Sequence, residues 1–116
     1  MALIATVSLS CEKEKAVEHR YYIRYEAEPV SQSAEEQYKV LVTDQFGDNL
    51  IDAEGKFSCV AGPVKNGFQA YIYALIDNAT RGYDVKIYVA QDNSPFVLRA
   101  SGTDSQQYFI NEKDWE

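Results

Sequence analysis

Histidine, cysteine and long apolar runs are scarce in this sequence, and each scarcity argues against a class of function. His19 is the only histidine, so a histidine-rich metal site is not expected. The two cysteines, Cys11 and Cys59, do not have the spacing of a zinc or redox motif. No stretch of about 18 apolar residues occurs, so no membrane-spanning helix is predicted.

Basic residues are also few, and they do not form a patch. The 116 residues include 11 Lys and Arg against 18 Asp and Glu, which gives a formal net charge of −7. Nucleic-acid binding needs clustered positive charge to neutralise phosphates, so no nucleic-acid partner is expected. The acidic residues between positions 44 and 54 surround a predicted turn and do not follow the EF-hand spacing. We therefore expect no metal site and no cofactor.

Tyrosine, in contrast, is abundant, and it favours strands. The chain has nine tyrosines, and from residue 20 onward apolar and polar residues alternate with a period of two. About seven or eight such stretches follow one another, separated by turns rich in Gly, Pro, Asp and Asn. We predict an all-β fold, a single antiparallel immunoglobulin-like β-sandwich of about 7–8 strands. A small closed barrel is the alternative.

The alternation also predicts which side chains are buried, because residues of one parity in a strand share one face. The residues predicted to be buried are Tyr21, Ile23, Val40, Phe57, Ile72, Val85 and Ile87. Cys59 has the parity of Phe57, so its thiol is expected to be an inert part of the core. His19, just before the first predicted strand, is expected to be exposed.

The first 17 residues differ in composition from the rest of the chain. Residues 2–9 are apolar with small residues among them, and Ser10, Cys11 and a charged segment follow. This order resembles a bacterial lipobox, in which Cys11 would become the lipidated first residue, although a basic start is missing. We expect residues 1–17 to be a signal or lipobox remnant with a charged tether, and residues 18–116 to form the β-sandwich domain. The alternative is that residues 3–9 form a short edge strand.

Three longer stretches carry a family resemblance, namely YYIRYEA, FSCVAGPVKNGFQAYIYA and VKIYVAQDNSPFVLRASG. Their order resembles small cell-envelope lipoproteins of the Bacteroides group, and the segment SCEKE is similar to the mature N-termini of those proteins. The resemblance covers most of the chain, residues 9–110. It implies a lipid on Cys11 and a small β-sandwich, and it implies no known activity and no catalytic residues.

Four tyrosines have the parity of the solvent-facing side of their strands. They are Tyr22, Tyr71, Tyr73 and Tyr88. We expect Tyr71, Tyr73 and Tyr88 to lie on adjacent strands and, with Tyr22 and Leu75, to form an exposed aromatic patch. Such patches suit sugar rings, protein partners or a second copy of the chain, because they bury area at low entropic cost. The alternative is that cross-strand tyrosine pairs only stabilise an exposed sheet face.

The polar residues that catalysis requires are few, so an enzyme is not expected. We expect a non-catalytic exported lipoprotein with a binding or structural role at the cell envelope, on the periplasmic side of the outer membrane or at its surface. Its partner is expected to be a protein or a glycan, with a homodimer as a further option, and only the lipid anchor would contact the membrane. The alternative is a soluble adaptor or inhibitor β-domain that binds a protein partner.

Replacing Cys11 tests the lipobox prediction. When the chain is expressed with an export signal in a bacterial host, we expect incorporation of labelled fatty acid and recovery in the membrane fraction. Cys11→Ser should abolish the label and release the protein, because acylation is the expected anchor. Cys59→Ser is the matched control and should keep both properties. An unlabelled wild-type chain would contradict the prediction.

Overall fold

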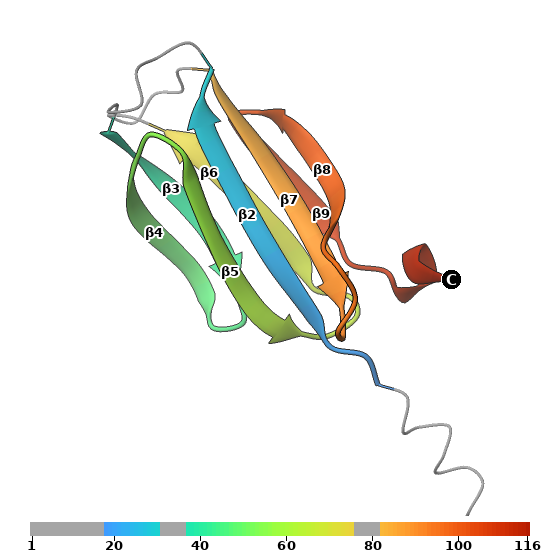
Figure 1. Ribbon diagram of the computed structural model, residues 1–116. Helices are drawn as coiled ribbons and strands as arrows, with labels where there is room; N and C mark the ends of the chain where they lie inside the picture. Colours follow the sequence, from blue (N-terminus) through green and yellow to red (C-terminus); the bar gives the residue numbers. More distant parts are fainter. Residues whose placement is uncertain (1–17, 31–36, 76–81) are drawn as a thin grey trace, which may run out of the picture.

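Eight antiparallel strands form two four-stranded sheets in the part of the chain that the computed structural model describes, residues 18–30, 37–75 and 82–116 (Figure 1). One sheet has the order β5-β2-β7-β8 and the other the order β4-β3-β6-β9. The strands are β2 (Tyr21–Pro29), β3 (Gln37–Asp44), β4 (Gly47–Glu54), β5 (Phe57–Val64), β6 (Gln69–Leu75), β7 (Tyr83–Gln91), β8 (Val97–Thr103) and β9 (Ser105–Phe109).

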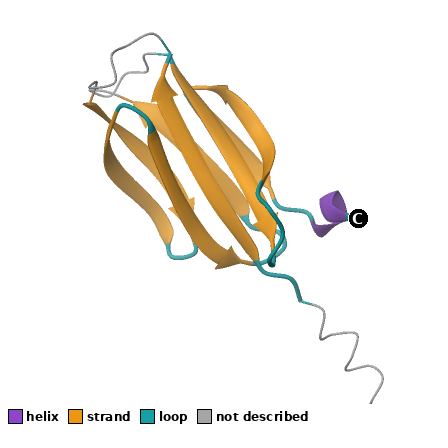
Figure 2. Cartoon of the chain, in the orientation of Figure 1, coloured by secondary structure: helices purple, strands orange, loops and turns teal. Residues whose placement is uncertain are grey.

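The two sheets pack face to face, which confirms the predicted antiparallel β-sandwich. The strand number agrees with the prediction, and the strands form two separate sheets rather than one closed barrel. The short 3-10 helix η1 (Glu112–Trp115) was not predicted, and it is the one helical element of the described residues (Figure 2). No helix in the described ranges is long and apolar enough to span a membrane.

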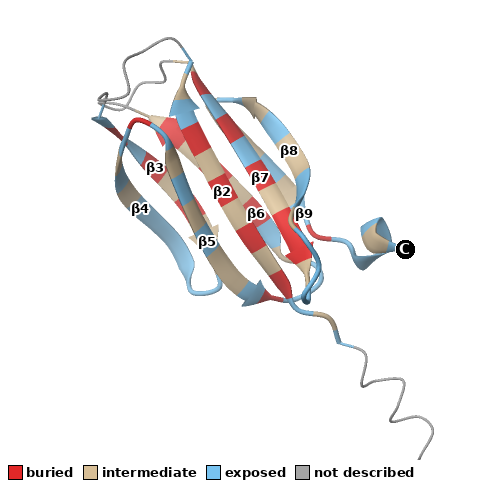
Figure 3. Cartoon of the chain, in the orientation of Figure 1, coloured by how far each residue is buried: buried red, intermediate tan, exposed pale blue. Residues whose placement is uncertain are grey.

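Buried residues alternate with partly exposed ones along the inner strands, as the sequence predicts (Figure 3). The buried core contains Tyr21, Ile23, Val40, Ile72, Val85 and Ile87, which confirms these predictions. Phe57 was predicted to be buried and is only half-buried. The reason is its position on β5, an edge strand, so that a neighbouring strand covers it on one side only.

A tyrosine hydroxyl from each sheet crosses the core to backbone groups. Tyr25 on β2 is fully buried, and its hydroxyl donates to the Thr43 carbonyl at 2.6 Å and accepts from the Tyr71 N–H at 3.2 Å. The ladder between β3 and β6 ends one residue before this point, at Val42 opposite Ile72. The Tyr25 hydroxyl therefore takes the place of the next ladder bond. Burial raises the pKa of this phenol, which keeps it protonated and able to donate.

A second tyrosine makes the same kind of link from the other sheet. The hydroxyl of Tyr38 on β3 lies 3.2 Å from the Ala27 carbonyl on β2 and 2.5 Å from the Gly55 carbonyl in the turn between β4 and β5. Its ring stacks on that of Tyr83, with ring centroids 4.4 Å apart. Each core tyrosine thus contributes both apolar packing and a hydrogen bond that holds the two sheets in one alignment.

The β3–β4 hairpin is fixed to β5 through one side-chain amide. Gln45 in the hairpin turn donates to the Gly62 carbonyl at 2.9 Å and accepts from the Gly62 N–H at 3.0 Å. Gly62 has a φ of 126°, and a Cβ there would lie 2.8 Å from the Tyr21 carbonyl oxygen, so only glycine fits. Gly62 and Pro63 together lie opposite Tyr22 and form a bulge in β5.

Removing the Tyr25 hydroxyl tests the importance of the link across the core. Tyr25→Phe should lower the free energy of unfolding by about 1–3 kcal/mol, because it leaves the Thr43 carbonyl and the Tyr71 N–H without their shared partner. Tyr22→Phe is the control, since its ring lies on the outer face of the same strand, and it should change stability by less than about 0.5 kcal/mol. Urea unfolding of both variants gives the comparison. Equal effects would show that the Tyr25 hydroxyl is not a structural link.

Candidate functional site

The four outward tyrosines lie on two opposite faces of the sandwich. Tyr22 and Tyr88 belong to β2 and β7 of one sheet, and Tyr71 and Tyr73 belong to β6 of the other. The prediction that Tyr71, Tyr73 and Tyr88 lie on adjacent strands is therefore wrong. The physical reason is that the chain crosses from one sheet to the other between β6 and β7. The parity prediction is confirmed, because all four side chains are partly exposed.

The outer face of the β4-β3-β6-β9 sheet carries a row of apolar side chains that crosses the strands. Leu50 lies opposite Leu41, Leu41 opposite Tyr73, and Tyr73 opposite Ser105. Directly opposed residues of antiparallel strands point to the same side, so this row is continuous. We call it, together with Tyr71 and Phe109 on the same side, the leucine–tyrosine face.

The leucine–tyrosine face is exposed at its two ends and half-buried in its middle. Leu50 is 60% exposed and Phe109 is 62% exposed, whereas Leu41, Tyr71 and Tyr73 are half-buried. The edge strands therefore present their apolar side chains most openly. Scattered apolar residues are ordinary on protein surfaces, but a contiguous apolar row on a solvated sheet face needs an explanation.

Polar groups flank the row from Leu50 to Tyr73, and one polar pair lies between Tyr71 and Phe109. On one side Lys39 Nζ lies 2.5 Å from the Asp52 carboxylate, an exposed pair that neutralises itself. On the other side the amides of Gln69 and Gln107 bond each other at 2.9 Å. Both polar pairs are satisfied within the protein, and Leu50, Leu41 and Tyr73 themselves carry no charge. This combination, an apolar centre with a polar rim, is the usual composition of a binding surface.

The opposite outer face is organised around a cation. Arg24 on β2 lies over the Tyr88 ring at 4.2 Å and over the Phe96 ring at 5.0 Å, and its Nε lies 3.1 Å from the Glu26 carboxylate. This Arg24 Nε is buried and has no hydrogen bond of acceptable geometry. Farther along the same face Glu26 lies opposite Lys86. Val60 opposite Arg24 and Leu98 opposite Tyr88 are exposed on this side as well. This outer face of the β5-β2-β7-β8 sheet, which we call the Arg24 face, thus mixes charged and apolar side chains, and two of its aromatic rings contact a cation.

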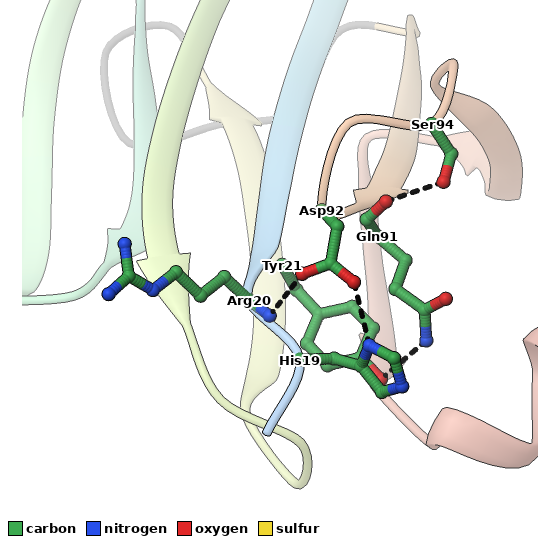
Figure 4. A network of polar contacts seen from close by, with 6 residues as sticks. All are labelled: His19, Arg20, Tyr21, Gln91, Asp92 and Ser94. Atoms are coloured by element: carbon green, nitrogen blue, oxygen red, sulfur yellow. Dashed lines mark hydrogen bonds and ion pairs between the residues drawn. The ribbon is translucent and has the colours of Figure 1, made fainter. Parts of the chain in front are cut away.

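The end of the sandwich near the start of β2 holds the histidine in a network of polar contacts (Figure 4). His19 Nδ1 lies 2.6 Å from one oxygen of Asp92, and the other oxygen accepts from the Arg20 N–H at 3.0 Å. These two bonds, that of the Arg20 N–H first, lower the pKa of Asp92. His19 was predicted to be exposed, but its side chain is 32% exposed because Asp92 and the neighbouring turn cover it.

Two shallow hollows border His19, but the groups around it do not form a catalytic constellation. One hollow, of about 320 Å³, is lined by His19, Gln91, Glu112, Trp115 and Glu116. Among the described residues no serine, threonine or cysteine bonds to His19, and Ser94 instead donates to the Gln91 carbonyl. What the described contacts show is that Asp92, just after β7, holds the His19 ring and the Arg20 N–H at the start of β2.

The remaining candidates have structural roles or lie outside the described residues. Cys59 is a free, half-buried thiol packed against the core, and burial followed by the nearby Asp44 raises its pKa. It is therefore a poor nucleophile.

No group of three potential metal-ligating side chains occurs in the described ranges. Asp44 accepts from the Phe46 N–H at 2.8 Å, as expected for a turn residue. Cys11, the predicted lipidation site, lies outside the described residues.

Sequence reasoning missed three members of the leucine–tyrosine face. Leu41 alternates with Val40 and Val42, so its outward direction could have been recognised from parity alone. Leu50 and Phe109 lie on edge strands, where the alternation is weak. Their place beside Tyr73 depends on the register between strands, which the sequence of one strand does not contain.

Comparisons with protein-family models, curated proteins and solved structures found no match to this chain. The interpretation of the leucine–tyrosine face therefore rests on its own geometry and chemistry.

Stability measurements distinguish an exposed tyrosine pair from core tyrosines. We expect the double variant Tyr71→Ser with Tyr73→Ser to unfold with a loss well below the roughly 3–5 kcal/mol of a deleted core aromatic, because both rings are half-exposed. Tyr21→Ser is the matched control, since this ring is fully buried, and it should lose that full amount. Thermal or urea unfolding followed by circular dichroism gives both values. A double variant as unstable as Tyr21→Ser would show that Tyr71 and Tyr73 are core residues.

Proposed function

We propose that this protein is a non-catalytic binding domain that is held at the cell envelope by a lipid on Cys11 and engages its partner through the leucine–tyrosine face. The observation that carries the proposal is the continuous row from Leu50 through Leu41 to Tyr73, which crosses three strands without a charge. The partner is a protein or a glycan of the envelope.

The physical case for binding is the cost of leaving this surface in water. Each apolar square ångström removed from water contributes roughly 25 cal/mol, and half-buried tyrosines lose little conformational entropy when a partner covers them. The tyrosine hydroxyls can also hydrogen-bond a partner while their rings stack on it. The Arg24 face fits this role less well, because its Tyr88 and Phe96 rings already contact a cation and charged side chains interrupt its apolar ones.

The proposed location is supported by the composition of the N-terminal segment. An apolar stretch, Ser10, Cys11 and a charged tether are the parts of a lipoprotein signal, and the resemblance to Bacteroides-group envelope lipoproteins implies the same anchor. A single sandwich on a tether of this kind has one outer face of each sheet available for contacts.

The proposed absence of catalysis is supported by what the polar side chains do in the described ranges. The carboxylate of Asp92 bonds the backbone of Arg20 and the ring of His19, and the thiol of Cys59 packs on the core. These groups are engaged in holding the fold together. The His19–Asp92 pair borders a hollow, but no serine, threonine or cysteine of the described ranges bonds to His19.

The immunoglobulin-like detail of the fold prediction remains a prediction. Two antiparallel sheets packed face to face support it, whereas the strand order counts against it. In immunoglobulin domains the first two strands are neighbours in one sheet. Here the first two described strands, β2 and β3, lie in different sheets.

Binding to envelope material tests the proposed function. We expect the immobilised full chain to retain a specific protein or glycan from a detergent extract of the envelope of the producing cell. Replacing Tyr71 and Tyr73 together by Ser should reduce this retention at least about tenfold, since aromatic anchors dominate interface energies. Replacing Tyr22 and Tyr88 together by Ser is the matched control on the opposite face. Equal retention by all three proteins would contradict the proposed face.

A further inference from the structure

The four edge strands of the sandwich differ in how their free backbone groups are protected. The edge of β5 is closed at Gly62, whose N–H and C=O both bond Gln45, and Pro63 beside it has no N–H to offer. The edge strand β8 is bulged at Arg99, and β9 has only five residues. Bulges, prolines and shortness are the usual devices against pairing with another strand.

The edge of β4 has no bulge and no proline and is eight residues long, and its protection is the charge of its side chains. Its eight residues pair with β3 without a register shift, and six of the eight are exposed. Asp44 and Gly47 flank a two-residue hairpin loop and form a hydrogen-bonded pair. Hydrogen-bonded and non-hydrogen-bonded pairs alternate along an antiparallel ladder, so every second residue of β4 bonds to β3. The backbone groups of the residues in between point to the free edge, and these residues are Asp48, Leu50, Asp52 and Glu54. No described residue forms a hydrogen bond to these backbone groups from that side. Figure 3 shows β4 as the most exposed strand of its sheet.

The side chains of these four residues have a definite charge pattern. The Asp52 carboxylate pairs with Lys39 Nζ and is 85% exposed, and the Asp48 carboxylate accepts from the Thr43 hydroxyl at 2.9 Å. Glu54 is exposed and forms no ion pair with a described residue. Leu50 lies between the acids and is 60% exposed. The edge therefore presents negative charge on both sides of one apolar position.

This pattern disfavours a second copy of the same strand. An antiparallel pairing of two β4 strands with Leu50 opposite Leu50 would place Asp48 of each copy opposite Asp52 of the other. Like charges directly opposite each other destabilise a strand pair. A strand with cations at the corresponding positions would instead gain both the backbone hydrogen bonds and the charge pairing.

We infer that β4 accepts an extended segment of a protein partner as an additional strand, with Lys or Arg opposite Asp48 and Glu54 and an apolar residue opposite Leu50. Backbone hydrogen bonds would supply the affinity and the alternate side chains the specificity. This inference rests on the proposed function and narrows its partner to a protein with a basic, alternating segment. The added strand would extend the leucine–tyrosine face, because Leu50 belongs to both surfaces.

A synthetic peptide tests the inference directly. The probe is an extended threonine-rich peptide with leucine and flanking lysines on one side of its alternation, and its binding to the full chain is measured by fluorescence anisotropy. We expect binding that the same peptide with glutamates in place of the lysines does not show. Replacing Asp48 by Asn and Glu54 by Gln should weaken binding roughly two- to thirty-fold, from about 0.2–1 kcal/mol for each cross-strand charge pair.

Two controls separate strand addition from a general charge effect. The variant Glu28→Gln with Asp84→Asn removes the same charge from exposed positions of the other sheet and should leave affinity unchanged. A lysine peptide N-methylated at the residues that face β4 cannot donate its backbone hydrogen bonds and should lose binding. Absence of binding by the lysine peptide, equal binding by its N-methylated form, or equal losses in both charge variants would overturn the inference.

The outcome also distinguishes this inference from the proposed function. If the lysine peptide does not bind, and the Tyr71 and Tyr73 double variant retains less envelope material than the wild type, the β4 edge is rejected as a binding site and the leucine–tyrosine face is retained. If the peptide binds, and the double variant retains as much envelope material as the wild type, the leucine–tyrosine face is rejected and the β4 edge is retained as a binding site.

Discussion

The hydroxyl of Tyr25 is the interaction on which the arrangement of the two sheets depends. It bridges the Thr43 carbonyl of β3 and the Tyr71 N–H of β6 at the point where the ladder between these strands ends. A side chain of one sheet thereby completes the hydrogen bonding of the other sheet. The same contact fixes the backbone beneath the Tyr71 ring, so the core tyrosine also determines where the outer aromatic side chain is presented.

The sequence predicted much of the fold and part of the candidate site. The period-two pattern identified the buried face of β2, β6 and β7, where apolar residues of one parity alternate with polar ones. It was wrong for Phe57, because parity does not show that β5 is an edge strand. It was also wrong in placing Tyr88 beside Tyr71 and Tyr73, since the sheet to which a strand belongs is decided by long-range pairing. The bridge made by Tyr25 could not be predicted either, because it depends on the packing of both sheets.

The two outer faces of the sandwich are chemically different, and this difference directs the functional interpretation. On one face Arg24 covers the Tyr88 and Phe96 rings, and the charged side chains Glu26 and Lys86 lie opposite each other. On the other face leucine and tyrosine side chains form a row that internal polar pairs flank but do not interrupt. When a partner covers an apolar surface such as the leucine–tyrosine face, the free energy of the system falls. The regular edge of β4 adjoins that row, so partner contacts through side chains and through backbone would lie side by side.

The most direct test of this account is hydroxyl-radical footprinting of the full chain in the intact envelope of the cells that produce it, compared with the purified chain. The account predicts that Leu50, Tyr71, Tyr73 and Phe109 are labelled less in the envelope than in the purified protein, while Tyr22 and Tyr88 are labelled equally in both. Reduced labelling of Tyr22 and Tyr88 with unchanged labelling of Tyr71 and Tyr73 would contradict it.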